Sequence, residues 1–408
     1  WAHRRAPLRR VWLEIVMTTN VPATEEFARA RASMSEAGCD FALLSSVANV
    51  TYATGTEVPV PVGAGAELTY GPWLALIPAR EATGWFVVPA GGAAFARERA
   101  VGFDVLAFDM LFDSFQPVDA RASYLNRIRE ALRAAGLDNA RATVGVEMRS
   151  LPRETAALMA LEFPRVTLVN AEVALVQARL VKTEREIALL RRAAKLADVA
   201  QETLAELVRT AGQTEFAMFG EISARVFAEA GRDIPLSGEL VTGPRTTTVE
   251  YPNGPRTRTT EPGDAALMDL SGRSEGYWFD CTNTHVIDAE PTATQLKFAR
   301  ASQDACEAAM ATLRPGAKAS DAAKAAETAF ATHGLPMAHY AGHQIGVTVN
   351  ELPRLVPYDD TPIEAGMVFS VEPGAYEGAG GSFGARSEKM VLVTPTGPEI
   401  LSTFSWGI

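Results

Sequence analysis

The sequence predicts an α/β domain followed by an α+β domain. A chain of 408 residues is long enough for two domains. In its first part, short apolar runs alternate with helical stretches, as in an α/β domain. The composition then changes across residues 163–186, and long helical stretches and a glycine-marked hairpin follow.

The first domain is predicted to open with a helix and a strand. From Thr24, apolar residues recur at helical spacing and stop at Gly38, after which Phe41-Ala-Leu-Leu44 has the pattern of a strand. Further elements follow in order: strands at 73–77, 85–88, 103–108 and 143–146, and helices near 122–135 and 153–161. No cluster of His, Cys or carboxylate residues indicates a site in this part of the sequence, so we expect it to serve packing, assembly or the shaping of a cleft.

The second domain is predicted to start near residue 172, which gives domains 17–172 and 173–408. Thr183 and Glu186 have the spacing of a capping box, and the apolar positions after them predict a long helix. Three more helices are expected, at about 214–230, 292–312 and 320–333.

Composition limits the classes of partner. A net charge of −11 argues against nucleic acid and against anionic membranes, and no apolar run approaches the roughly 18–20 residues that span a bilayer. The chain has three cysteines, Cys39, Cys281 and Cys306. They are too few and too scattered for a disulfide framework, which favours the reducing cytoplasm as the location. Residues 1–16 are basic and then briefly apolar, and we expect a non-native or unstructured extension before a natural start at Met17.

Residues 265–285 carry two aspartates, Asp269 and Asp280, on either side of a glycine-marked turn. Placing the centre of the turn between Ser274 and Glu275 pairs Asp269 directly with Asp280 across a β-hairpin. Opposed carboxylates repel unless a proton or a cation lies between them. The alternatives are two solvated aspartates on an edge hairpin and half of a metal site, and the second requires more ligands further along the chain.

Candidate ligands follow in three segments. His339 and His343 are four residues apart, but the glycines and β-branched residues around them favour a loop or strand over a helix, and at most one of the two is expected to bind a metal. Glu372 ends one apolar strand and Glu388 precedes another, where side chains tend to be buried and buried carboxylates need a partner.

Four carboxylates carry a charge of about −4, which favours two divalent cations over one. The predicted ligands are Asp269, Asp280, His343, Glu372 and Glu388. Oxygen-rich ligation with one nitrogen suits manganese, our first expectation, and also zinc, cobalt or iron. Metals roughly 3.5–4 Å apart can share a bridging water whose pKa falls to about 7.

The segments MDL…YWFDCTNT, GHQIG, FSVEPGAY and ARSEKMVLVT resemble the pita-bread metallopeptidases, the family of Xaa-Pro aminopeptidases, prolidases, methionine aminopeptidases and creatinase. The first domain resembles the amino-terminal domain of the prolidase and creatinase branch through residues 38–44 and 49–55. The resemblance implies a pita-bread fold for the second domain, two metals bridged by Asp280 and Glu388, and a homodimer.

Two positions depart from the family pattern. Glu250 and Asn350 stand where prolidase-type peptidases have histidines, whereas His339 is retained. Glu250 can act as a general base and Asn350 can donate a hydrogen bond, or the pocket has changed its substrate. Arg386, two residues before Glu388, is either a partner for a substrate carboxylate or carbonyl or part of a structural salt bridge. We therefore assign Glu250, His339, Asn350 and Arg386 as candidate catalytic residues.

Three functions remain open. The first is a dinuclear hydrolase resembling Xaa-Pro aminopeptidases and dipeptidases, in which a metal-bridging hydroxide attacks a peptide or amide carbonyl. The second is a metal-dependent non-peptidase hydrolase or lyase acting on a small polar molecule. The third is a non-catalytic binding module. For either enzyme the expected partner is a small peptide or a small polar substrate.

Overall fold

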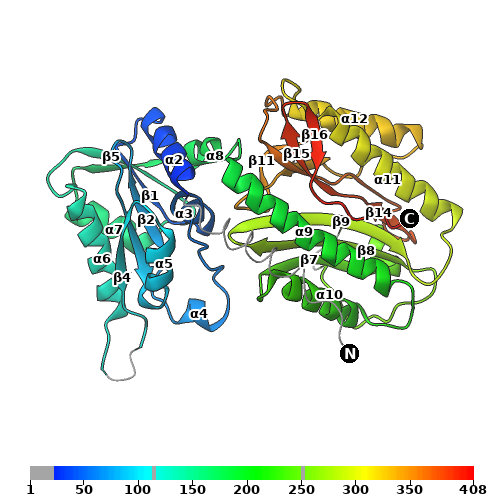
Figure 1. Ribbon diagram of the computed structural model, residues 1–408, viewed down its shortest axis with the longest axis horizontal. Helices are drawn as coiled ribbons and strands as arrows, with labels where there is room; N and C mark the ends of the chain where they lie inside the picture. Colours follow the sequence, from blue (N-terminus) through cyan, green and yellow to red (C-terminus); the bar gives the residue numbers. More distant parts are fainter. Residues whose placement is uncertain (1–22, 113–115, 250–252) are drawn as a thin grey trace, which may run out of the picture. The chain divides into compact units, whose positions relative to one another are not determined.

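The computed structural model describes residues 23–112, 116–249 and 253–408 (Figure 1). The predicted extension at residues 1–16, the proposed start at Met17 and the candidate Glu250 lie outside the described residues. The chain forms two compact units that divide between Leu180 and Val181. Among the described residues, none of the helices combines the length and the apolar character needed to cross a bilayer.

The first unit contains a six-stranded sheet in the order β4-β3-β2-β1-β5-β6. Its strands are β1 (Phe41–Leu44), β2 (Leu74–Pro78), β3 (Gly84–Pro89), β4 (Phe103–Phe108), β5 (Ala142–Val146) and β6 (Val166–Asn170). The sheet is mixed, because β1 pairs antiparallel with β2 and parallel with β5. The predicted α/β class and five of these strands agree with the structure, whereas β6 was not predicted.

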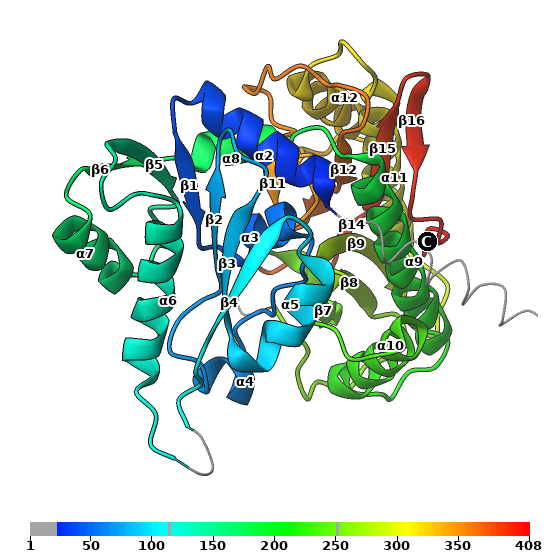
Figure 2. The ribbon, with the colours of Figure 1, turned by 60° about the vertical axis from the view of Figure 1, so that its left-hand side comes forward.

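Helices cover both faces of this sheet (Figure 2). They are α2 (Thr24–Glu36), α3 (Val47–Thr54), α4 (Gly63–Glu67), η1 (Ala90–Gly92), α5 (Ala93–Arg99), α6 (Ala120–Ala134), α7 (Arg153–Glu162) and α8 (Glu172–Ala178). On one face, apolar residues of α6 and α7, including Leu125, Ile128 and Leu158, pack into a buried core with strand residues such as Leu76 and Val144. Because α8 packs against α2, this helix belongs to the first unit, and the boundary lies at residue 180 instead of the predicted 172.

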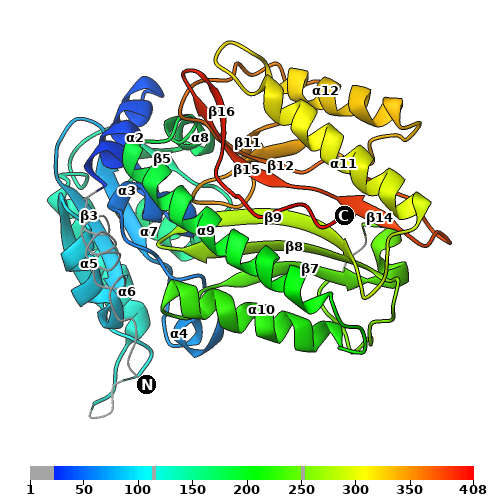
Figure 3. The ribbon, with the colours of Figure 1, turned by 45° about the vertical axis from the view of Figure 1, so that its right-hand side comes forward.

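Over residues 181–249 and 253–408, the second unit has three sheets and four long helices, whose arrangement is seen in Figure 3. One sheet has the order β7-β8-β9, formed by Leu236–Thr242, Ala265–Ser274 and Tyr277–Val286. A second has the order β11-β10-β12-β15-β16, formed by Glu351–Arg354, Gly342–Gln344, Val368–Val371, Lys389–Thr394 and Gly397–Ile400. The third pairs β13 (Gly374–Tyr376) with β14 (Gly384–Arg386).

The helices of the second unit cover these sheets in two pairs. The pair α9 (Glu184–Leu207) and α10 (Glu215–Ala230) packs on the β7-β8-β9 sheet, and α11 (Ala293–Thr312) packs on the other sheets beside α12 (Ala319–Thr332) (Figure 3). The predicted capping box of α9 is present: Thr183 Oγ1 accepts the amide of Glu186 at 3.1 Å, and Glu186 Oε2 accepts the amide of Thr183 at 2.9 Å. A short η2 helix (Gly243–Thr247) follows β7.

The β8–β9 hairpin corrects the predicted register. Ser274 pairs with Tyr277, so the turn consists of Glu275 and Gly276, both with positive φ (53° and 88°). Such a two-residue turn fits the twist of a hairpin, and it moves the centre one residue further along the chain than predicted. Asp269 therefore lies opposite Thr282, not opposite Asp280.

Candidate metal centre

The two aspartates still lie on one face of the β8–β9 hairpin. Asp269 pairs with Thr282, and Asp280 is two residues from Thr282 along β9, so the two carboxylates are diagonal neighbours. Side chains alternate between the faces of a strand, and residues two apart share a face. The two carboxylates therefore lie close together as predicted, but the predicted direct pairing of Asp269 with Asp280 across the hairpin was wrong.

The second sheet brings up the other three candidates. His343 is in β10, Glu372 follows β12, and Glu388 precedes β15, in a sheet where β12 lies between β10 and β15. Two hydrogen bonds join this region to the hairpin: the amide of Glu388 donates to the carbonyl of Thr282 at 3.0 Å, and the side-chain Oγ of Ser370 donates to the carbonyl of Asp280 at 3.2 Å. The five predicted ligands thus come from two sheets that contact each other.

The five side chains form two groups that share one carboxylate. Ligand atoms of Asp280, His343 and Glu388 lie within 4.8 Å of one another, and so do those of Asp269, Glu372 and Glu388. His343 Nε2 is 3.1 Å from Glu372 Oε1 and 3.6 Å from Asp280 Oδ2. All are buried except Asp269, which is partly exposed. Two overlapping groups with Glu388 in common are the arrangement expected of a pair of cations with a bridging ligand.

The proton on His343 can be assigned from its neighbours. Nδ1 is 2.9 Å from the carbonyl oxygen of Gln344, which can only accept, so Nδ1 carries the proton. In the neutral ring, Nε2 then directs a lone pair at the carboxylates of Asp280 and Glu372. Lone pairs and carboxylates repel, so a proton or a metal cation has to lie between them.

The carboxylates themselves also fit a cation. Asp269 Oδ1 and Glu388 Oε1 are buried and have no hydrogen-bond partner among the described residues. Burial first, and neighbouring carboxylates second, raise the pKa of Asp280 and of Glu388 well above the usual value. Charged carboxylates in this position need a compensating positive charge, and the oxygen-rich donor set with one imidazole suits a divalent transition metal.

Arg386, at the end of β14, is buried. Its guanidinium makes hydrogen bonds to four groups, and its Nε also lies 4.0 Å from Glu372 Oε2. Its Nη2 lies 2.7 Å from Glu239 Oε2 and 2.8 Å from Asp269 Oδ2, Nη1 donates to the Tyr376 hydroxyl at 2.7 Å, and Nε donates to Thr282 Oγ1 at 3.2 Å. The salt bridge that was one of the two predicted alternatives is therefore present.

The sequence reasoning missed Glu239 and Tyr376 as neighbours of this cluster. Glu239 is a single acidic residue in the otherwise uncharged strand β7, and buried carboxylates need a partner, so it offered a signal. Tyr376 follows Glu372 by four residues in a segment already singled out, but nothing in that pattern indicated a contact with Arg386.

His339 lies beside Tyr376. Its Nδ1 is 2.9 Å from the carbonyl oxygen of Tyr340, which places the proton there, and its Nε2 is 3.2 Å from the Tyr376 hydroxyl. Burial, followed by the charge of Arg386, lowers the pKa of His339. The ring is thus held neutral, with Nε2 accepting the hydrogen bond from Tyr376.

Asn350, which is half-buried, lies between Tyr340 and Arg354. Its Nδ2 is 3.5 Å from the Tyr340 hydroxyl, and its Oδ1 accepts Arg354 Nε at 3.2 Å. The Arg354 guanidinium lies over the Tyr340 ring, 5.9 Å from the centroid, and that ring is 6.1 Å from the His343 ring. Asn350 is thereby linked to the carboxylate cluster through one aromatic side chain, with an exposed cation next to it.

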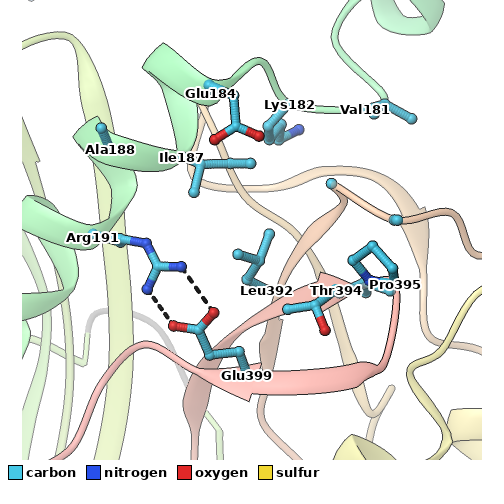
Figure 4. A pocket seen from close by; sticks show the side chains of 13 residues that line it. Val181, Lys182, Glu184, Ile187, Ala188, Arg191, Leu392, Thr394, Pro395 and Glu399 are labelled. Atoms are coloured by element: carbon cyan, nitrogen blue, oxygen red, sulfur yellow. Dashed lines mark hydrogen bonds and ion pairs between the residues drawn. The ribbon is translucent and has the colours of Figure 1, made fainter.

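A separate hollow of about 490 Å³ lies beside the start of α9 (Figure 4). The ion pair between Arg191 and Glu399 spans part of it, with Nη2 2.8 Å from Oε2. None of the five predicted ligands lines this hollow, so it is not part of the carboxylate cluster.

Each of the two units matches a known protein family. Residues 188–395 match the profile of metallopeptidase family M24, and residues 27–181 match that of the creatinase/prolidase N-terminal domain. A "Probable dipeptidase PepE" of Mycobacterium tuberculosis is 32% identical over 222 residues, which cover 54% of this chain and 57% of that protein. An Xaa-Pro dipeptidase of Lactobacillus delbrueckii is also 32% identical, over 54% of this chain and 59% of its own length. The matched region therefore spans a little over half of each relative.

The crystal structure of dipeptidase PepE from Mycobacterium ulcerans aligns over 95% of this chain and 97% of its own, with a TM-score of 0.75 and 26% identity. The prolidase of Pyrococcus horikoshii has the same fold, with a TM-score of 0.75 at 22% identity.

Proposed function

This chain belongs to metallopeptidase family M24 and has its pita-bread fold, and we propose that it is a dinuclear metal-dependent hydrolase of short peptides. The observation that carries the proposal is the pair of overlapping ligand groups with Glu388 in common. Asp269, Asp280, His343, Glu372 and Glu388 would hold the two ions. Glu388, which is common to both groups, would be shared between them, and the resemblance implies the same role for Asp280. Manganese is the first candidate.

When bound, the ions would polarise the scissile carbonyl and lower the pKa of water at the site. The protein itself fixes the ligands. The Nδ1–H bond of His343 to the Gln344 carbonyl sets the ring orientation, and the hydrogen bond of 2.7 Å from Thr282 Oγ1 to Glu388 Oε2 leaves Oε1 for a cation. Preorganisation of this kind reduces the cost of binding and of reaction.

Arg354 supplies a cation for the substrate. It is exposed, its Nε donates to Asn350, and it lies over Tyr340 next to the cluster. A guanidinium binds a carboxylate in a bidentate manner. We assign Arg354 to the terminal carboxylate of a dipeptide, in agreement with the relatives named as dipeptidases.

The test is turnover by the purified, manganese-loaded chain of Xaa-Pro dipeptides, Xaa-Pro tripeptides and dipeptides without proline. We expect cleavage of dipeptides, and a rise in KM of tenfold or more in Arg354→Gln that is not seen in the exposed control Arg314→Gln, because a charge-assisted bond is lost. A metal-loaded chain that cleaves no peptide of the panel would rule out the peptidase.

A metal-dependent reaction on a small polar molecule is the second candidate. The observation in its favour is Asn350, which occupies the position of a histidine in the resembling peptidases and is committed to Tyr340 and Arg354. Full metal loading combined with inactivity on every peptide would support it. A chain that binds no divalent ion would instead support the non-catalytic binding module.

A further inference from the structure

Glu239 lies directly opposite Asp269 in neighbouring strands. The register of β7 and β8 pairs the two residues, so their carboxylates share one face of the sheet. Like charges in this position destabilise a sheet unless a cation separates them. Arg386 supplies that cation, because its Nη2 is 2.7 Å from Glu239 and 2.8 Å from Asp269.

Arg386 cannot move away from Asp269 easily. Its Nη1 and Nε are held by Tyr376 and Thr282, and its side chain is only 3% exposed. The second oxygen of Glu239 accepts a hydrogen bond from Asn253 Nδ2, so Glu239 is fixed at both oxygens. The guanidinium is therefore held next to a predicted metal ligand, where an uncompensated positive charge would repel cations.

The charges show what Glu239 contributes. The four ligand carboxylates and Arg386 together carry −3, and Glu239 returns the total to −4. That is the charge which two divalent cations neutralise. Within the part of the chain that the structure describes, Asp269 Oδ1, the oxygen that does not face Arg386, has no hydrogen-bond partner.

We propose that Glu239 is a positioning residue of the metal centre, which neutralises Arg386 and so leaves the Asp269 carboxylate available to a cation. The inference rests on the proposed function. Without the charge of Glu239, Asp269 becomes the main partner of Arg386, and this ion pair competes with metal binding. Glu239 acts through Arg386 and does not itself bind the metal or the substrate.

A double-mutant cycle measured by calorimetric titration of the full metal-free chain with Mn²⁺ tests this inference. We expect Glu239→Gln to weaken binding of at least one Mn²⁺ by about tenfold or more, the usual cost of losing a residue that orients a metal ligand. In an Arg386→Gln background the same substitution has little to neutralise, and we expect a change of less than threefold.

If Glu239→Gln lowers the Mn²⁺ affinity equally in the native and the Arg386→Gln chain, Glu239 acts by its charge alone and not through Arg386. If Glu239→Gln leaves the Mn²⁺ affinity unchanged, Glu239 has no role in metal binding. Both results overturn the inference while leaving the hydrolase intact. A native chain that binds no Mn²⁺ would overturn the inference and the proposed function together. Glu239→Asp keeps the charge, and should bind Mn²⁺ more tightly than Glu239→Gln. If Glu239→Gln does not fold, the comparison of Glu239→Asp with the native chain and of Arg386→Gln with the double variant decides the question.

Discussion

Replacing Glu388 with glutamine should change stability in opposite directions with and without metal. Glu388 belongs to both ligand groups, and its Oε1 has no hydrogen-bond partner in the described ranges. Its pKa is raised by burial and by neighbouring carboxylates. In the metal-free protein at pH 7, the substitution removes a buried charge held among like charges. We therefore expect metal-free Glu388→Gln to unfold at the same or a higher temperature than the metal-free native chain.

Metal reverses the order. A ligand at 100 times its Kd stabilises the folded state by about 2.7 kcal/mol, so two ions contribute about 5 kcal/mol. With about 2–4 °C per kcal/mol for a domain of this size, saturating Mn²⁺ should raise the unfolding temperature of the native chain by roughly 10–20 °C. Loss of the shared ligand should remove most of this rise in Glu388→Gln.

Differential scanning calorimetry with and without Mn²⁺ measures both effects. The matched control is Glu364→Gln, because Glu364 is exposed and lies outside both ligand groups. It should behave as the native chain does in both states. An equal Mn²⁺-dependent rise in the unfolding temperature of Glu388→Gln would speak against its role as the shared ligand, and a clear destabilisation of its metal-free form would speak against the expected relief of charge repulsion.

Three further predictions follow from the same contacts. The pKa values of Asp280 and Glu388 are raised in the folded chain, so their contribution to the stability of the metal-free protein is fully present below about pH 4 and is lost as the pH rises. Urea unfolding from pH 4 to 8 should show this loss, and a constant or rising contribution would contradict it. Asn350→His should raise any Xaa-Pro dipeptidase activity, measured as kcat/KM, because it restores the side chain found in the resembling peptidases; an unchanged rate would remove our account of that departure. Lys182 is buried, with Nζ 2.9 Å from Glu351 Oε2, so Lys182→Met leaves a buried carboxylate without its ion-pair partner and should lower the free energy of unfolding by about 3–5 kcal/mol. The exposed control Lys195→Met should lower it by less than about 0.5 kcal/mol.

Local sequence signals predicted most elements well. The strand Phe41–Leu44 and the capping box at Thr183 appear as expected, because apolar periodicity and side-chain capping act over a few residues. The elements that were not predicted include helices α3 and α5 and strand β7. Strand β6 was also missed because it has little buried surface, and α8 because it lies where the composition changes. The assignment of α8 depends on its packing against α2, which is a long-range contact.

The predicted metal ligands and the predicted register of the β8–β9 hairpin had different outcomes. The residues in the two groups were predicted from their settings at strand ends and from the resemblance, and the structure brings them together. The predicted turn of the hairpin was centred one residue too early. The turn consists of Glu275 and Gly276, both with positive φ, and a positive φ is rarely expected for a residue other than glycine. Glu239 was missed because its partner, Arg386, is distant in the sequence and close only in the fold.

We propose that five side chains from two sheets hold a pair of metal ions. The most direct measurement is anomalous diffraction from a crystal of the native chain soaked in Mn²⁺, collected near the manganese edge. We expect two peaks, one among Asp280, His343 and Glu388 and one among Asp269, Glu372 and Glu388. A single peak would contradict the dinuclear centre, and the absence of any peak within reach of Glu388 would contradict the metal site itself.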